Sequence, residues 1–197
     1  MISDELVGFI SKMKHSPAYN YVIPGLTSWL IGLPHPEHGC VRMFTMSRHH
    51  EEPIIPHSHR FDFRCLVLKG RVRNNIWRPS AVDGDLYAVS DVTYEGRLGV
   101  HRRAELNEAL FSKSERHYKA GEEYAMRAEE FHSIYFDKGS MVLFFEGANR
   151  LDKSQVLEPV VMGERIPLFK TENWMFRRET TNVGVNRNCP GVPGQSG

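Results

Sequence analysis

The feature that most constrains the fold is a succession of short apolar segments separated by turn residues. Between about residues 25 and 147, segments such as GLTSWLIG and CVRMFTMSRH alternate with Gly-, Pro- and Asp-containing stretches such as LPHPEHG and DKGS. Short strands with turns at regular spacing are typical of an antiparallel sandwich or barrel. We therefore predict an all-β fold, a single antiparallel jelly-roll barrel.

The two ends of the chain differ from this pattern. Ser3, followed by Leu6, Phe9, Ile10 and Met13 at helical spacing, predicts a short N-terminal helix within residues 1–18 that packs on the barrel. The barrel is expected over residues 19–178. Residues 179–197 are rich in Gly, Pro and Asn and are expected to form a flexible tail.

Two further local structures are predicted inside the barrel. Residues 63–68 and 71–77 read as two strands, and Gly70 between them supplies the positive φ of a hairpin turn. The polar stretch HRRAELNEALFSKSER, residues 101–116, is less regular. We expect a short helix or an exposed loop there.

Charge and hydropathy exclude several classes of partner. The 25 basic and 24 acidic side chains give a net charge of +1, which favours neither nucleic acid nor an anionic membrane. The apolar runs are shorter than the roughly 20 residues of a membrane span, and the N-terminal residues lack the pattern of a signal peptide. We expect a cytoplasmic protein without nucleic-acid or membrane partners.

The cysteines indicate neither a disulfide framework nor a cysteine-rich zinc site. Cys40, Cys65 and Cys189 are odd in number, widely spaced and without a CxxC pair. Cys65 is expected to pack as a small buried hydrophobe. The alternative is that Cys65 lines a site.

The stretch PHSHRFDFRCLVLKG places two histidines two residues apart at the start of an apolar strand. Residues i and i+2 of a strand share a face, so His57 and His59 should project the same way. The residues expected on that face are Phe61, Phe63, Cys65 and Val67, and those expected opposite are Ser58, Arg60, Asp62 and Arg64. Two imidazoles would then stand at the mouth of an apolar interior.

A third histidine, His132, lies in the distant segment FHSIYF and shares a face with Ile134 and Phe136. Neutral imidazole nitrogens bind first-row divalent metals, and catalytic sites combine about three protein ligands with open positions. His57, His59 and His132 are therefore the predicted metal ligands. The remaining histidines considered are interpreted as surface or polar core residues: His35, His38, His49, His50, His101 and His117.

These two histidine segments resemble the two motifs of the cupin family, small jelly-roll barrels that often hold one metal. The first motif is Gly, five residues, His-x-His, three or four residues, Glu, six residues, Gly, and here His57, His59 and Gly70 match it. The second motif places a Gly eleven residues before a His, as Gly121 and His132 are placed. Glu51 and Phe63 replace the opening glycine and the glutamate ligand of the first motif. In the second, Arg127, Glu129 and Phe136 replace the proline, the second glycine and the asparagine.

Cupins with three histidines and no glutamate resemble the thiol dioxygenase branch, in which Fe²⁺ activates O₂ toward a small thiol. This resemblance implies one divalent metal per chain, with Fe²⁺ favoured over Mn²⁺, Ni²⁺ or Zn²⁺, a small-molecule substrate and a homodimer. The predicted function is a mononuclear non-heme iron dioxygenase. The alternatives are a non-enzymatic cupin that binds a small molecule or carbohydrate with a structural metal, and an interaction barrel without metal.

Some roles stay open at this stage. No catalytic residue is assigned, and Arg42, Tyr87, Tyr124 and Tyr135 are candidates for polar groups inside the barrel. Asp62 is expected to pair with Arg60 or Arg64 on the outer face. In the alternative, a β-bulge turns its carboxylate inward as a fourth metal ligand.

Overall fold

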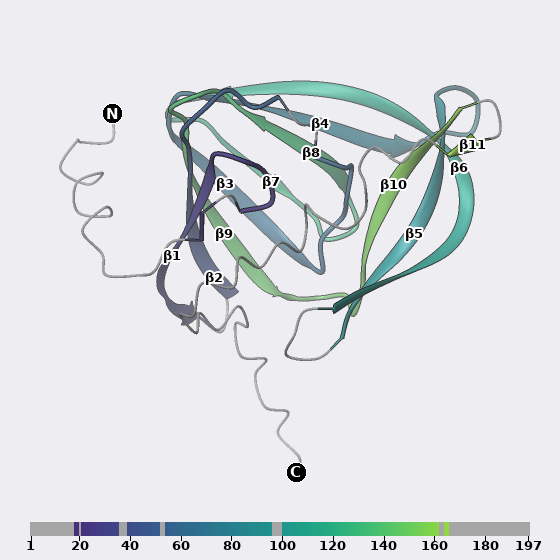
Figure 1. Cartoon of the computed structure of the whole chain (residues 1–197), viewed down its shortest axis with the longest axis horizontal. Helices are drawn as coiled ribbons and strands as arrows, with labels where there is room; N and C mark the ends of the chain where they lie inside the picture. The colour runs from purple at the N-terminus through teal and green to yellow at the C-terminus, as the bar shows by residue number, and fades with distance from the viewer. Residues whose placement is uncertain are drawn as a thin grey trace, which may run out of the picture.

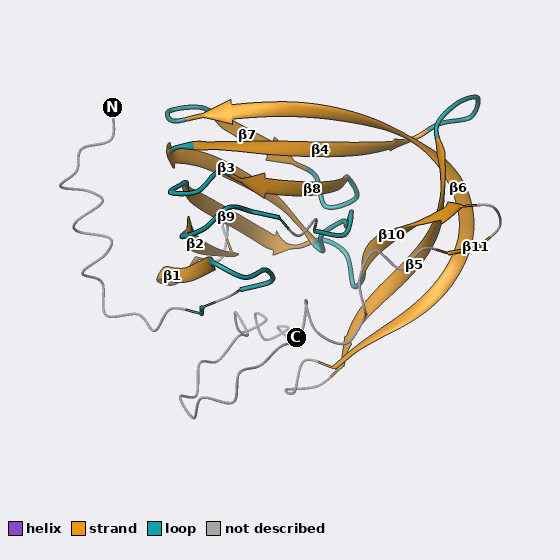
Figure 2. Ribbon diagram, turned by 45° about the horizontal axis from the view of Figure 1, so that its top comes forward, coloured by secondary structure: helices purple, strands orange, loops and turns teal. Residues whose placement is uncertain are grey.

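The computed structural model describes residues 18–19, 21–35, 39–51, 54–95, 100–161 and 164–165. Within these ranges every regular element is a β-strand and no residue is helical, which confirms the all-β prediction (Figure 2). Ala18 forms a β-bridge with Ser28. The rest of the predicted N-terminal helix and the predicted tail at 179–197 lie outside the described residues.

The strands form two antiparallel sheets that face each other (Figure 1). The first sheet has the order β1-β2-β9-β3-β7 and contains β1 (Leu26–His35), β2 (Gly39–Met46), β9 (Met141–Asn149), β3 (Phe61–Lys69) and β7 (Glu123–Met126). The second has the order β11-β10-β5-β6-β4-β8 and contains β11 (Glu164–Arg165), β10 (Ser154–Val161), β5 (Asp85–Glu95), β6 (Val100–Lys119), β4 (Arg71–Pro79) and β8 (Phe131–Phe136). Neighbours in space are mostly distant in sequence, as in a jelly roll.

The inner faces of the two sheets meet in a shared apolar core, the larger of the buried clusters. Alternate residues of each strand point inward, as the burial of Tyr124 and Met126 between exposed neighbours in β7 shows. The buried members of this core from the strands are Leu26, Met46, Phe63, Cys65, Val67, Val72, Ile76, Tyr124, Met126, Phe136, Val142 and Phe144. We use this core to define the inner face of each strand.

The predicted hairpin at Gly70 is wrong. β3 pairs with β7 and β9, whereas β4 pairs with β6 and β8, so the turn at Gly70 carries the chain from one sheet to the other. Gly70 has the expected positive φ of 74°. A positive φ is required by many kinds of tight turn, and the sequence does not say which strands the turn connects.

Gly70→Ala is expected to destabilise the protein more than Gly139→Ala does. Both glycines have positive φ, 74° and 81°, which costs an alanine about 1–2 kcal/mol. A Cβ at Gly70 would also lie 2.8 Å from Ser140 Oγ and 2.9 Å from Ser140 Cα, whereas one at Gly139 meets nothing within 4 Å. Urea unfolding of both variants measures the difference, and equal losses of unfolding free energy would contradict the packing argument.

The predicted helix or loop at residues 101–116 is also wrong, because this segment belongs to the 20-residue strand β6. The C-terminal half of β6 pairs with β4, from Arg71↔Lys119 to Pro79↔Phe111. The N-terminal half pairs with β5, from Asp85↔Phe111 to Glu95↔Val100. Figure 1 shows β6 running along β4 and then bending beside β5. Residues 112–117 are exposed on both faces, so this strand carries no alternation of apolar and polar residues for the sequence to reveal.

Candidate metal centre

The His57-x-His59 segment lies between β8 and β10, just before β3 begins. His57 exchanges two backbone hydrogen bonds with His132, at 2.9 and 3.0 Å, and also forms a bridge with Val156. His59 N donates to Ala128 O at 2.9 Å. On the other side of the segment, Ser58 N donates to Gln155 O and Gln155 N donates to Ser58 Oγ. These bonds fix the extended backbone that lets His57 and His59 project the same way.

The structure brings the three predicted histidines together. Ring nitrogens of His57, His59 and His132 all lie within 4.8 Å of one another. The ring centroids are 4.9 to 5.2 Å apart, and His59 Nε2 lies 3.0 Å from His132 Nε2. His132 is buried, while His57 and His59 are half-buried at the barrel mouth. Among the described residues, no carboxylate belongs to this group.

Hydrogen bonds to the Nδ1 atoms orient two of the rings. His57 Nδ1 lies 2.8 Å from the carbonyl oxygen of Ile55, which can only accept, so this nitrogen carries the proton. His132 Nδ1 lies 2.9 Å from Asn74 Oδ1. In both rings the Nε2 lone pair is then available toward the centre of the group, as in protein metal sites where the second nitrogen binds a polar partner.

The donor set fits a divalent metal. Metal–imidazole bonds are about 2.1 Å long, so two nitrogens at a right angle are about 3.0 Å apart and two at a tetrahedral angle about 3.4 Å. The 3.0 Å between His59 Nε2 and His132 Nε2 corresponds to the right angle. Three histidine donors would leave coordination positions open for water or substrate.

Burial keeps the three imidazoles neutral, which is the form that binds metal. The pKa of His57 is lowered by burial, partly offset by the bond to Ile55. Burial lowers the pKa of His59 further below its usual range, and the charge of His57 adds to this effect. Burial also holds the pKa of His132 well below its usual range, helped by the charges of His57 and His59.

Aromatic side chains form the wall around the group. The Phe63 ring, at the position of the glutamate in the cupin motif, lies 4.7 Å from the His59 ring and 5.2 Å from the His132 ring. Phe61 lies 5.2 Å and Phe144 6.2 Å from His59. An apolar wall of this kind limits the access of water to the ring nitrogens.

Asp62 does not point at the histidines. A register irregularity does occur between Phe61 and Phe63, but Asp62 Oδ1 accepts a hydrogen bond from Ala128 N at 2.8 Å and Oδ2 pairs with Arg150. Burial alone would raise the pKa of Asp62, and the bonds from Ala128 and Arg150 outweigh it, so the net pKa is lowered. The expected outward direction is therefore observed, although Arg150 replaces the expected partners Arg60 and Arg64.

Asp62→Ala is expected to leave metal binding unchanged and to lower the free energy of unfolding by about 1 kcal/mol, because it removes the acceptor of the Ala128 amide. The matched control is Asp137→Ala, which removes only the exposed ion pair with Arg71 and should cost less. Urea unfolding and metal analysis of both variants measure these effects. Loss of metal from Asp62→Ala would show that its carboxylate reaches the site.

Two of the four polar candidates lie on the inner face. Arg42 lies two positions before Phe44, which is partly buried and packs against the core. The guanidinium Nε of Arg42 lies 3.6 Å from Glu146, which also accepts a hydrogen bond from Cys40 at 3.0 Å. Tyr124 packs in the core. The half-buried Arg42–Glu146 ion pair therefore places charged groups in the otherwise apolar interior.

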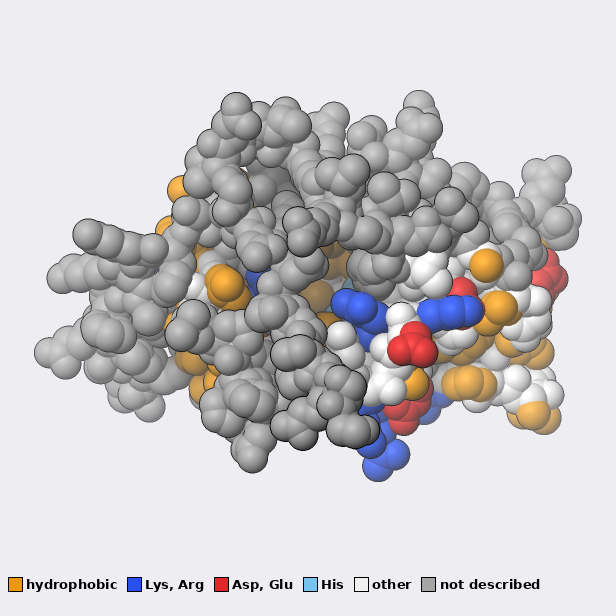
Figure 3. Space-filling view, turned by 90° about the horizontal axis from the view of Figure 1, so that it is seen from below, with side chains coloured by type: hydrophobic (Ala, Val, Ile, Leu, Met, Phe, Trp, Pro, Cys, Tyr) orange, Lys and Arg blue, Asp and Glu red, His pale blue; other side chains and the backbone are white. Residues whose placement is uncertain are grey.

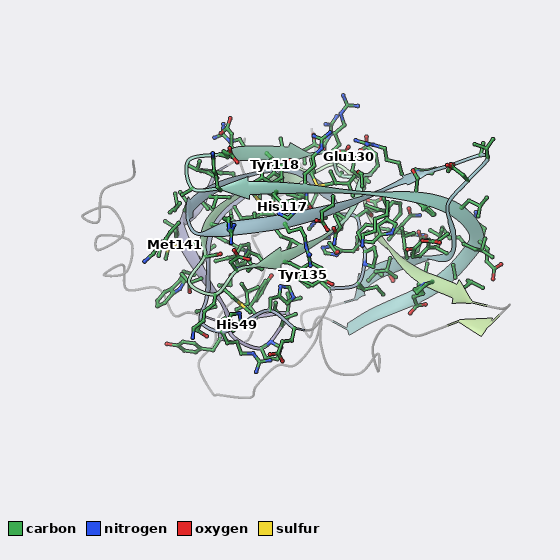
Figure 4. The ribbon with its side chains drawn as sticks, turned by 90° about the horizontal axis from the view of Figure 1, so that it is seen from above. His49, His117, Tyr118, Glu130, Tyr135 and Met141 are labelled. Carbon is green, nitrogen blue, oxygen red and sulfur yellow. The ribbon has the colours of Figure 1, made fainter. Side chains whose placement is uncertain are left out.

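The other two candidates, Tyr87 and Tyr135, lie away from this interior. Tyr87 belongs to a second apolar cluster, where it accepts a hydrogen bond from Trp77 at 2.9 Å. Tyr135 lies on the outer face beside Arg73, whose guanidinium is 4.4 Å from the ring centre. Figure 4 shows Tyr135 apart from the labelled Tyr118 on β6.

The remaining histidines within the described part do not join the group. His117 bonds to Glu115 at 2.7 Å, and His50 accepts a hydrogen bond from Phe136 N at 3.1 Å. Figure 4 shows His49 and His117 on different parts of the barrel. Cys65 packs in the core, where burial raises the pKa of its thiol to about 12, so it is an inert thiol.

The surface carries mixed charge. In the space-filling view of Figure 3, basic and acidic side chains of the described residues lie side by side.

A groove of about 650 Å³ lies on the first sheet, and its charged residues are Asp62, Arg64, Arg127 and Glu130. This groove does not include the three histidines. Among the described residues there is no helix long and apolar enough to cross a membrane.

Sequence reasoning missed Asn74, the partner of His132. The segment RVRNNIWR is rich in basic residues, yet Asn74 within it is 0% exposed on the inner face of β4. The alternation of Val72, Asn74 and Ile76 is the signal that could have placed Asn74 inside.

No protein-family model matches the chain, and no curated protein matches its sequence. Among solved structures, it is similar to KdgF from Halomonas sp., at 15% identity over 70% of this chain and 91% of that chain, with a TM-score of 0.40. An RmlC-like cupin from Shewanella frigidimarina has 14% identity over 70% of this chain and 87% of that chain, with a TM-score of 0.40. Hydroxypropylphosphonic acid epoxidase from S. wedmorenis has 10% identity over 68% of this chain and 55% of that chain, with a TM-score of 0.42.

These scores are below 0.5, so the fold is assigned from the sheet topology itself. Two facing antiparallel sheets, whose neighbouring strands are mostly distant in sequence, form a jelly-roll-like barrel. The jelly-roll barrel that the succession of short strands predicted is therefore confirmed.

Proposed function

We propose that the chain is a metal-binding cupin in which His57, His59 and His132 hold one divalent metal. The observation that carries this proposal is the convergence of three neutral imidazoles, within 4.8 Å of one another, inside an apolar barrel mouth. Each ring comes from a backbone segment that neighbouring strands fix. Such a donor set accepts Fe²⁺, Mn²⁺, Ni²⁺ or Zn²⁺, and the metal favoured here is Fe²⁺.

We further propose that the protein is a mononuclear non-heme iron dioxygenase acting on a small molecule. When bound, Fe²⁺ supplies the one-electron and O₂ chemistry that protein side chains lack. The three neutral donors leave its full charge in place and keep coordination positions open. Phe61, Phe63 and Phe144 exclude water from this region and pack against an apolar part of the substrate.

The substrate class proposed first is a small thiol, because a thiolate neutralises part of the charge that three neutral ligands leave on the metal. The half-buried Arg42 and Glu146 lie on the same inner face and supply polar contacts for the substrate. A dioxygenase places both oxygen atoms of O₂ in its product and needs no external reductant. This agrees with a sequence that carries no recognisable nucleotide, flavin or nicotinamide motif.

The test is O₂ consumption by protein loaded with Fe²⁺, measured with a panel of small thiols and with the corresponding alcohols as controls. Uptake that requires both Fe²⁺ and a thiol supports the dioxygenase. Metal binding without O₂ uptake would indicate a non-enzymatic cupin with a structural metal. A folded protein that binds no metal would indicate an interaction barrel.

Organisation beyond the site is also proposed. We expect a homodimer in the cytoplasm, a barrel over residues 19–178, an N-terminal helix packed on it and a flexible tail at 179–197. Light scattering coupled to size-exclusion chromatography measures the oligomeric state. Hydrogen exchange measures the protection of both ends.

A further inference from the structure

A buried amide supports the deepest of the three histidines. Asn74 in β4 is 0% exposed, and its Oδ1 lies 2.9 Å from His132 Nδ1 in β8. On its other side, Asn74 Nδ2 lies 3.3 Å from the sulfur of Met126 in β7. The contact series Met126, Asn74, His132 therefore joins the two sheets beneath the metal centre.

The Met126 contact decides which way the amide faces. A thioether sulfur accepts hydrogen bonds and cannot donate them, so the NH₂ group of Asn74 faces Met126. The amide oxygen must then face His132. Because this oxygen only accepts, Nδ1 of His132 carries the ring proton and Nε2 keeps its lone pair.

We propose that Asn74 is a positioning residue that holds His132 in its Nδ1-protonated tautomer, with Met126 fixing the orientation of Asn74. This inference rests on the proposed metal site and goes beyond it by naming the groups that prepare the site. The partner of a metal-binding histidine is often a carboxylate. A neutral amide in this place adds no negative charge, so both the ligands and the partner of His132 are uncharged.

The Nδ1-protonated tautomer of His132 also explains the short contact between the His59 and His132 rings. His59 Nε2 lies 3.0 Å from His132 Nε2, and only one proton fits between them. Because His132 Nε2 keeps its lone pair, His59 donates to it in the metal-free protein. A metal held by both nitrogens would take the place of this hydrogen bond, and His59 would then carry its proton on Nδ1.

The test uses two readouts, of which the first needs no metal. Long-range ¹H–¹⁵N NMR of metal-free protein reports which ring nitrogen of His132 is protonated. We expect Nδ1 protonation in the wild type and loss of that single tautomer in Asn74→Leu. An Nε2-protonated His132 in the wild type would overturn the proposal, whether or not the protein binds metal and whether or not the variant folds.

The second readout is the affinity for Co²⁺, measured by chelator competition and by its visible absorption. Asn74→Leu should weaken binding by about 10- to 100-fold. Asn74→Asp keeps an acceptor at the same place and should restore affinity to at least the wild-type value. The matched control is Asn75→Leu, since Asn75 is also buried but alternates to the opposite face of β4.

The pattern across these variants separates positioning from a merely structural role. Unchanged Co²⁺ affinity in a folded Asn74→Leu, or equal losses in Asn74→Leu and Asn75→Leu, would overturn the proposal. If the wild type shows the expected tautomer but binds no Co²⁺, the proposed metal function fails while the orientation of His132 stands.

Discussion

Replacing His132 with alanine is expected to reduce bound metal from about one per chain to nearly none. The change removes one of three donors and also leaves the buried Asn74 oxygen without its partner. His57→Ala and His59→Ala should have the same effect on metal content, because two imidazoles seldom hold a first-row metal against buffer and chelator. Elemental analysis of each purified variant, with circular dichroism as a folding check, measures the loss.

His49→Ala and His117→Ala are the matched controls for this result. Both residues are exposed, neither belongs to the group of three, and His117 bonds to Glu115. Their metal content should equal that of the wild type. Equal losses in the control and site variants would show that metal binds at the surface and not within the barrel.

The second large effect expected is a steep dependence of metal affinity on pH, starting below 6.5. A free histidine with a pKa near 6.5 would lose metal as soon as the pH falls through that value. Here burial lowers the pKa of His57, His59 and His132, so protons compete for these rings only at lower pH. Affinity should therefore be nearly constant from pH 8 to 6.5.

Below this range, each histidine that must release a proton makes the apparent affinity fall about tenfold per pH unit. Titration with Co²⁺ at a series of pH values measures both the onset and the slope. An exposed two-histidine peptide serves as the reference for unshifted imidazoles. An onset at or above 6.5 in the protein would contradict the argument that burial keeps the rings neutral.

The sequence could predict the fold class and the histidine group, because both depend on local spacing. Strand alternation placed His57 and His59 on one side, and the resemblance to the second cupin motif, with its eleven-residue spacing from Gly121, implied His132 as the third member. Phe63, Cys65 and Val67 lie on the inner face as expected. The inward direction of these side chains needed only the period of a strand.

Long-range pairing could not be predicted in the same way. Gly70 revealed a turn but not that the turn joins two sheets, since the residues that pair with β3 and β4 lie at least 32 residues further along the chain. β6 was missed because its exposed half has polar side chains on both faces. Its extended conformation comes from hydrogen bonds to β4 and β5, which no local pattern records.

The direction of single polar side chains was the least predictable part of the site. Asp62 pairs with Arg150, 88 residues away, and not with either neighbouring arginine. Asn74 stands in a basic segment and yet faces the interior, where it contacts His132 and Met126. In both cases the partner is brought near by sheet pairing, which becomes known only with the fold.

The most direct test of the metal centre is the metal content of wild-type protein purified without added metal and then incubated with Fe²⁺ under anaerobic conditions. The proposed site predicts about one divalent metal per chain, held through gel filtration and released by acid. A folded protein that retains less than about a tenth of a metal per chain, with Fe²⁺ and likewise with Mn²⁺, Ni²⁺ and Zn²⁺, would contradict it. His57, His59 and His132 would then be ordinary polar residues of the barrel mouth.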